Sequence, residues 1–267
     1  MKRVLTIAAI AALLISCTTQ QPASEVEDKT PGFVLSDGNV EVKIGEDGAL
    51  LSLVNKETGH NYASGEGLWR MFYNTHQEKE MQIDGTENTP AVSQEGEVIT
   101  IAYKDLVHRG KALKMDLTLT VKVEDGAVRF GSVVSNNEPG TIIRELQYPL
   151  VGNMSLPEGH KLLTTHTGGQ VHDDALDLIV NVNPKTLYMK PDQYFRQYDL
   201  QYPRHAASNC YAFFGENDGL YFGSHDQSLQ QTWHGLRAYP SAPGQFDRLE
   251  AGFYRYPNAM CGDTWSC

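Results

Sequence analysis

Histidine and carboxylate side chains that could act as an acid and a base are spread through the second half of the 267-residue sequence. They are His166, His172, His225 and His234, with Glu145 and Asp226 as carboxylates. General acid–base catalysis requires a base that takes a proton from the reacting group and an acid that delivers one. None of these residues lies in a recognisable catalytic motif, so we assign no catalytic residue and treat a structural role as the simpler interpretation.

The segment from His166 to Asp174, HTGGQVHDD, invites a metal-site hypothesis because imidazoles and carboxylates are competent zinc ligands. Its spacing fits no closed structural zinc pattern, and its composition is typical of a loop. We therefore predict no metal and no cofactor for this chain.

Aromatic residues offer a second kind of chemistry, because an aromatic ring can stack on the apolar face of a pyranose. Trp69 stands between Leu68 and the Met71-Phe72 pair and is interpreted as core. Trp233 stands in a polar setting shortly after His225 and Asp226. Those three residues are the candidate carbohydrate contacts. A further aromatic-rich stretch covers residues 188–205.

The elements that would position these residues are short strands. Apolar and polar residues alternate over residues 39–44, 49–54, 97–103, 113–123 and 128–134, and Asp-Gly turns separate several of these runs. Alternation places one face in a core and the other in water, as an antiparallel sheet allows. Together the runs predict an all-β class, a large antiparallel β-sandwich over residues 33–267.

Residues 211–226, YAFFGENDGLYFGSHD, predict a hairpin in the middle of a large sheet. The acidic residues of its turn, Glu216 to Asp218, are interpreted as solvated turn formers, like Glu46-Asp47 and Glu124-Asp125. Residues 173–179 could form one short helix. Residues 190–202 are predicted to be loop.

The N-terminus has the pattern of a secretory leader: a basic start, an apolar run from Val4 to Ile15, and Leu-Ile-Ser-Cys at residues 14–17. The run is shorter than the ~20 residues that a membrane-spanning helix needs. The Leu-Ile-Ser-Cys sequence resembles the bacterial lipobox, which implies cleavage after residue 16 and lipidation of Cys17. Residues 17–32 are polar and predict a flexible tether. Localisation is then the bacterial cell envelope.

The charge and the cysteines narrow the choice of partners only slightly. The net charge of −11 becomes −13 when cleavage of the leader removes the positive charges of Lys2 and Arg3, which disfavours nucleic acid as a partner.

Besides Cys17 the chain has Cys210, Cys261 and Cys267. Three thiols cannot all pair, and although a secreted location permits a bond between Cys210 and Cys261, we predict no disulfide.

Four phrases together carry a family resemblance: GNVEVKIGEDGALLSLVNKETGHNYA at 38–63, TIIRELQYPLVG at 141–152, NDGLYFGSHD at 217–226 and YRYPNAMCGDTWS at 254–266. The ordered set resembles the N-terminal β-sandwich of bacterial multidomain glycoside hydrolases. The resemblance spans nearly all of the chain from Phe33. It implies a galactose-mutarotase-like supersandwich followed by a catalytic TIM barrel.

In the family resembled, both catalytic carboxyl groups come from the barrel, so the resemblance implies no catalytic residue in this chain. It also implies that the sandwich continues beyond Cys267, and we expect a chain truncated at its C-terminal end. The expected function is a non-catalytic, carbohydrate-associated domain of a lipid-anchored glycoside hydrolase. The alternatives are a stand-alone carbohydrate-binding lipoprotein and, third, a sugar mutarotase or epimerase.

Overall fold

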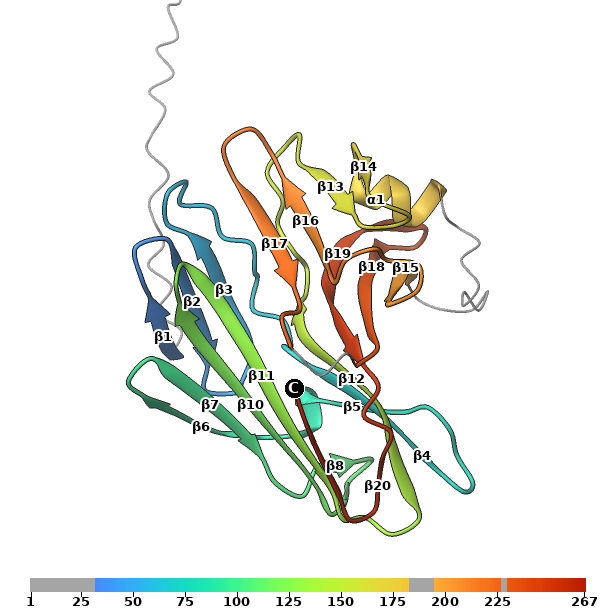
Figure 1. The fold of residues 1–267 in the computed structure, drawn as a ribbon. Helices are drawn as coiled ribbons and strands as arrows, with labels where there is room; N and C mark the ends of the chain where they lie inside the picture. The colour runs from blue at the N-terminus through green and yellow to red at the C-terminus, as the bar shows by residue number, and fades with distance from the viewer. Residues whose placement is uncertain (1–31, 183–194, 227–229) are drawn as a thin grey trace, which may run out of the picture. The chain divides into compact units, whose positions relative to one another are not determined.

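The computed structural model describes residues 32–182, 195–226 and 230–267, which all fall within one compact unit, Pro31–Cys267. Nearly all of its regular structure is β-strand, and every strand pairing between neighbours is antiparallel. The predicted all-β antiparallel sandwich is confirmed (Figure 1).

Two large sheets form the sandwich. A seven-stranded sheet has the order β15-β18-β19-β12-β4-β5, with β20 paired to β12. A five-stranded sheet has the order β21-β11-β10-β7-β6. The first sheet consists of β4 (Arg70–Thr75), β5 (Met81–Asp84), β12 (Thr141–Val151), β15 (Arg196–Tyr202), β18 (Thr232–Ala242), β19 (Gln245–Arg255) and β20 (Ala259–Met260). The second consists of β6 (Ala91–Glu95), β7 (Val98–Tyr103), β10 (Met115–Glu124), β11 (Ala127–Asn136) and β21 (Asp263–Ser266).

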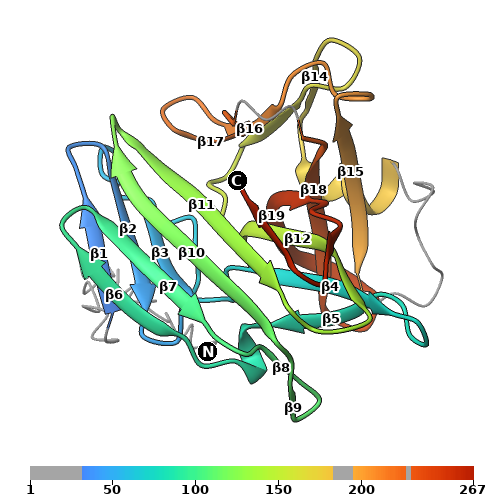
Figure 2. The same ribbon diagram turned by 60° about the horizontal axis from the view of Figure 1, so that its bottom comes forward.

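Smaller elements surround these sheets (Figure 2). β1 (Gly32–Ser36), β2 (Val40–Gly45) and β3 (Leu50–Asn55) form a three-stranded sheet, and β8 (Val107–His108) pairs with β9 (Lys111–Ala112). β13 (Lys161–Thr164), β14 (Gln170–His172), β16 (Cys210–Phe214) and β17 (Gly219–Gly223) form a four-stranded sheet. The helical pieces are η1 (Gly85–Glu87), α1 (Ala175–Asp177) and η2 (Leu178–Val182).

The alternation seen in the sequence becomes the core. In β10 every second residue is buried, from Met115 through Val123, while the residues between them are half-buried. Tyr148 of β12 joins the two large sheets: its hydroxyl donates to the Thr120 carbonyl at 2.8 Å, and its ring meets Phe130 edge-on at 5.7 Å. Trp69 is core as expected, with 2% of its surface exposed and its ring edge-on to Tyr103.

The short helix predicted near residue 175 is confirmed as α1, which Asp174 caps by accepting hydrogen bonds from the amides of Leu176 and Asp177. The loop predicted for residues 190–202 is wrong in its second half, because Arg196–Tyr202 forms β15; residues 190–194 lie outside the described residues. Tyr198 and Leu200 are buried on one side of β15, and polar residues lie between them. The polar residues made this segment resemble a loop, although its apolar and polar residues alternate as in a strand.

The hairpin of residues 211–226 exists as β16 and β17, but its predicted place in the middle of a large sheet is wrong. It belongs to the four-stranded sheet, in the order β14-β13-β16-β17, and β17 is the outer strand. Asp218 in its turn is also not a solvated turn former. Its carboxylate pairs with His160 at 2.7 Å, and the two side chains are only 9% and 3% exposed.

Candidate functional site

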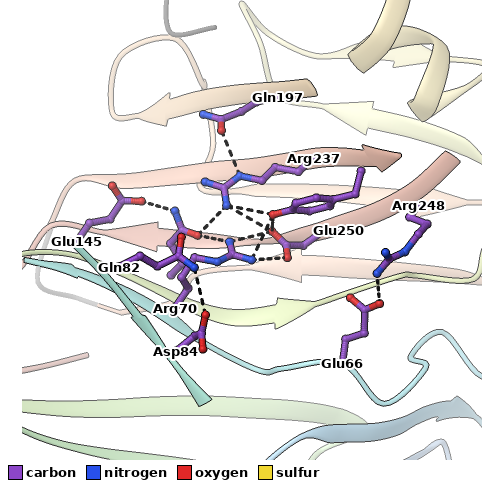
Figure 3. A network of polar contacts seen from close by, with 11 residues as sticks. Glu66, Arg70, Gln82, Asp84, Glu145, Gln197, Arg237, Arg248 and Glu250 are labelled. Carbon is purple, nitrogen blue, oxygen red and sulfur yellow. Dashed lines mark hydrogen bonds and ion pairs between the residues drawn. The ribbon is translucent and has the colours of Figure 1, made fainter. Parts of the chain in front are cut away.

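A polar array covers one face of the seven-stranded sheet. The opposite face of the same strands carries core residues such as Met71, Leu146, Leu236 and Phe253. Because strand side chains alternate, the residues between these point the other way. We call this second face the polar sheet face; it carries Arg70, Glu145, Gln147, Gln197, Asp199, Trp233, Arg237, Tyr239, Glu250 and Tyr254. Figure 3 shows part of it, with Arg70, Glu145, Gln197, Arg237 and Glu250 labelled.

Strand register brings these residues together from distant parts of the chain. Arg237 of β18 lies opposite Gln197 of β15 on one side and opposite Glu250 of β19 on the other. A second row runs from Arg70 of β4 to Gln147 of β12. Residues up to 180 positions apart in sequence are therefore direct neighbours.

Glu250 lies at the centre of the array and binds Arg70 with both carboxylate oxygens. Arg70 Nη2 donates to Oε2 at 2.9 Å, and Nη1 donates to Oε1 at 3.2 Å. This two-pronged geometry is the strongest form of an arginine–carboxylate pair. Burial disfavours the charge on Arg70, but the Glu250 carboxylate outweighs that effect and raises the pKa of Arg70.

Arg237 is the second cation of the array, and its side chain is only 6% exposed. Its Nη1 lies 3.7 Å from Glu250 Oε1, and its Nε donates to Gln197 Oε1 at 3.1 Å. The guanidinium also lies over two aromatic rings, 4.6 Å from the centroid of Phe195 and 5.0 Å from that of Tyr254. Arg237 is therefore fixed in position by contacts on its edges and on its faces.

Neutral groups complete the array. The Gln147 side-chain oxygen accepts from Arg70 Nη1 at 2.7 Å and from Arg237 Nη1 at 3.1 Å. The Tyr239 hydroxyl accepts from Arg70 Nη2 at 3.2 Å and donates to Glu250 at 3.4 Å. With Gln197, which Arg237 also binds, two cations, one carboxylate and three neutral groups form one connected network.

A β-bulge adds a second carboxylate. The pairing of β12 with β4 shifts register between Ile143 and Glu145, so that Ile143 and Leu146 both reach the core although three positions separate them. Glu145 then lies on the polar sheet face, where its carboxylate accepts from the Gln147 amide. A bulge that re-aims a side chain is common near functional sites.

Gly235 makes room for one of the rings. A Cβ at Gly235 would overlap the phenol of Tyr254, which lies across it from the next strand. Tyr254 can therefore lie flat enough on the sheet to stack on Arg237.

Two carboxyl groups of the polar sheet face have altered proton affinities. Burial raises the pKa of Asp199 from 3.8 to about 7, although Arg237 and Gln197 oppose the shift. Burial likewise raises the pKa of Glu145. The pKa of Tyr256 is also raised, by burial and by the charges of Glu145 and Asp199. The Asp199 carboxyl is therefore about half protonated near neutral pH and can both donate and accept hydrogen bonds.

The three candidate carbohydrate contacts do not form one site. Trp233 lies half-buried on the polar sheet face, with its ring 6.1 Å from that of Tyr256. Asp226 pairs with Arg255 at 2.5 Å, and Arg255 bonds Thr232, a residue that points to the opposite side of β18 from Trp233. His225 lies 3.3 Å from the Tyr221 hydroxyl, at the end of β17. His225 and Asp226 thus share one location, and Trp233 has another.

Of the histidines considered as catalytic acids, His234 lies on the side of the seven-stranded sheet opposite to Glu145. His234 is the one histidine within the seven-stranded sheet, and it points to the core side, where Asn209 Oδ1 lies 3.1 Å from its Nε2. Burial and the charge of Arg255 lower its pKa to about 4. His166 bridges to Ala206, and His172 Nε2 lies 3.4 Å from the Thr164 hydroxyl.

No group of three or more histidine, cysteine or acidic side chains suited to a metal ion occurs among the described residues. Cys210, Cys261 and Cys267 carry free thiols; Cys17 lies outside the described residues.

Sequence reasoning missed most of the polar sheet face. Arg70, Arg237 and Glu250 stand in no motif of the sequence, and Gln147 lies within the phrase at 141–152 without standing out as a site residue. The one available signal was the repeated placement of long polar side chains at inward positions, as in Leu-Arg-Ala at 236–238 and Leu-Glu-Ala at 249–251. The order of the strands in the sheet must be known before one can see that these positions lie together.

Comparison with known proteins gives a result at the level of fold. The sequence matches no protein-family model, and no curated protein matches it. A galactose mutarotase related enzyme from Lactobacillus acidophilus superposes with a TM-score of 0.50 and 9% identity, over 89% of this chain and 95% of that one. A putative aldose 1-epimerase from Escherichia coli K12 also gives 0.50, with 6% identity, over 88% and 96%. The chain therefore has a galactose-mutarotase-like fold.

Removal of the Glu250 charge should destabilise the protein strongly, because it leaves two nearly buried arginines without their shared carboxylate. For Glu250→Gln we expect a loss of roughly 3 kcal/mol in the free energy of unfolding, measured by urea denaturation. Glu66→Gln is the matched control, since the Glu66–Arg248 pair is 37% and 42% exposed and such a pair contributes about 0–1 kcal/mol. Equal losses in the two variants would contradict a central role for Glu250.

The raised pKa of Asp199 should make stability depend on pH. The stability associated with its neutral form is present in full below about pH 4 and is lost as the pH rises toward and through 7, because the unfolded chain releases the proton earlier. Asp199→Asn keeps the neutral form at every pH. The difference in unfolding free energy between the variant and the parent should therefore move in favour of the variant by roughly 2–4 kcal/mol between pH 4 and pH 8. A difference that is flat across this range would refute the assignment.

Proposed function

We propose that this galactose-mutarotase-like sandwich binds carbohydrate on the polar sheet face and does not itself transform it. The observation that supports this best is that the array of Arg70, Gln147, Arg237 and Glu250 and the half-buried ring of Trp233 lie on the same face of the sheet. Sugar sites combine a few fixed polar groups with aromatic surface. The names of the structural neighbours, which mention galactose and aldose, point to the same class of ligand.

The geometry favours binding over anomer exchange. Glu145 lies on the polar sheet face, whereas His234 is turned to the opposite side of the sheet and is held neutral by burial. A base and an acid on opposite faces of one sheet cannot serve the same sugar ring. The arginines, in turn, are held in one position by several contacts, so that a ligand on this face would meet polar groups that are already ordered.

We further propose that the domain belongs to a secreted glycoside hydrolase anchored in the bacterial cell envelope through a lipid on Cys17. The lipobox-like end of the leader supports the anchor, and the resemblance to the first domain of multidomain glycoside hydrolases supports the parent enzyme. No helix in residues 32–182, 195–226 or 230–267 has the length and apolar character needed to cross a membrane. In this proposal the sandwich supports a catalytic barrel and guides the polysaccharide toward it.

A stand-alone carbohydrate-binding lipoprotein is the second candidate. It is favoured by the two structural neighbours, which the sandwich covers over 95% and 96% of their own length, so that the fold occurs without a barrel. A barrel-encoding sequence in the same reading frame downstream of Cys267 would support the hydrolase, and a stop codon there would support the stand-alone protein.

Carbohydrate binding should depend on Trp233. A glycan array with the mature protein identifies the best oligosaccharide, and isothermal titration calorimetry then gives its affinity. Trp233→Ala should weaken binding at least about tenfold, equivalent to about 1.4 kcal/mol, because the stacking surface is lost. Trp265→Ala is the control, since this half-buried tryptophan lies in β21 of the other sheet and should leave the affinity unchanged. Unchanged affinity in the Trp233 variant, or no binding on the array, would reject the proposed site.

Lipidation should depend on Cys17. Expressed with its leader in a bacterial host, the full chain should partition into the detergent phase of a Triton X-114 extraction, whereas Cys17→Ser should move to the aqueous phase. A serine variant that stays in the detergent phase would contradict the lipid anchor and point to a different mode of attachment.

A further inference from the structure

A cleft of about 830 Å³ lies along β17, on the side of the seven-stranded sheet opposite to the polar sheet face. One wall is β17 and the residues after it, and the other is formed by the ends of β3 and β11. β17 is the outer strand of the four-stranded sheet, as Figure 1 shows. The volume is within the range of small-molecule sites, which is about 300–1,000 Å³.

Tyr221 in this cleft is an aromatic ring laid flat on the strand. A Cβ at Gly223 would overlap the ring and hydroxyl of Tyr221, so the absence of a side chain at Gly223 lets the phenol lie across the backbone. Tyr221 is nevertheless 57% exposed, among the most exposed large hydrophobic residues of the described chain. One ring face thus rests on the strand, and a large part of the side chain remains open to a ligand.

Polar groups stand at one end of the cleft, next to this ring. The Tyr221 hydroxyl lies 3.3 Å from His225 Nε2. Beyond it, Asp226 accepts from Ser224 at 2.8 Å and pairs with Arg255. Arg255 is 6% exposed, whereas Asp226 keeps 21% of its side chain accessible. The buried arginine fixes the carboxylate, and the carboxylate and imidazole remain within reach of a ligand in the cleft.

The opposite wall is largely apolar. Leu53 and Val54 of β3 and Val128 and Phe130 of β11 line it. An exposed flat ring, fixed polar acceptors at one end and an apolar wall match a pyranose, which has apolar C–H faces and a rim of hydroxyls. The acidic character of the chain, with a net charge of −11, agrees with a neutral ligand better than with an anionic one.

We propose that the β17 cleft is a second, separate carbohydrate site, in which a pyranose unit stacks on Tyr221 and donates hydroxyl hydrogen bonds to Asp226 and His225. It does not depend on the polar sheet face, because Arg255 and Asp226 lie on the side of the seven-stranded sheet opposite to Trp233. A carbohydrate chain could therefore be held at two places on the same domain.

The test uses ¹⁵N-labelled mature protein titrated with methyl α-D-glucopyranoside, methyl β-D-galactopyranoside and methyl α-D-mannopyranoside, each up to high millimolar concentration. At least one glycoside should shift the amide signals of Gly223 and Ser224 in a saturable manner. Tyr221→Ala should weaken that binding at least tenfold. Tyr221→Phe keeps the ring and should retain it. Gly223→Ala keeps the tyrosine but displaces its ring and should weaken binding as Tyr221→Ala does.

Trp233→Ala separates this site from the polar sheet face, because it should leave the shifts at Gly223 and Ser224 unchanged. The proposal is overturned if none of the three glycosides shifts these amides, or if Tyr221→Ala binds as the parent does. It is also overturned if the shifts disappear in Trp233→Ala while Tyr221→Ala retains them, since the sugar would then be bound on the polar sheet face alone. If Trp233→Ala abolishes binding on the polar sheet face while the shifts at Gly223 and Ser224 persist and Tyr221→Ala removes them, the second site is supported.

Discussion

The sharing of one carboxylate by two arginines governs the rest of the seven-stranded sheet. Arg70 and Arg237 are nearly buried, and a buried charge is tolerated only when it is paired and hydrogen-bonded. Glu250 meets that requirement only if β4, β18 and β19 keep their register. The bulge in β12, the glycine at 235 and the stacking of Tyr254 all serve the same geometry.

Stability alone does not explain such an arrangement. Replacement of a buried ion network by apolar residues is often neutral or stabilising, so a polar face of this kind is weak evidence for stability as its purpose. A ligand rich in hydroxyl groups gives it a purpose, because fixed donors and acceptors bind without the loss of side-chain freedom that flexible groups suffer. The raised pKa of Asp199 adds a group that can serve as donor or acceptor near neutral pH.

Local pattern predicted the fold better than the site. The alternation of residues 113–123 correctly predicted β10, because a strand with one buried face has an apolar residue at every second position. The interpretation of Trp69 as core was also confirmed. β15 was missed because the polar residues of its second face, which are half-buried in the structure, made the segment look like a loop. The burial of Asp218 was missed because its partner His160 is 58 positions away in the sequence. The array itself depends on strand order, which no local pattern contains.

A crystal structure of the mature protein with the oligosaccharide that it binds most tightly tests the central claim most directly. The account predicts ordered sugar on the polar sheet face, with hydroxyl groups within hydrogen-bond distance of Arg237 or Glu250 and a ring against Trp233. The Arg70–Glu250 pair should keep its geometry on binding, since the array is already formed. A structure in which no sugar contacts this face, or in which the array must be dismantled to admit it, would contradict the account.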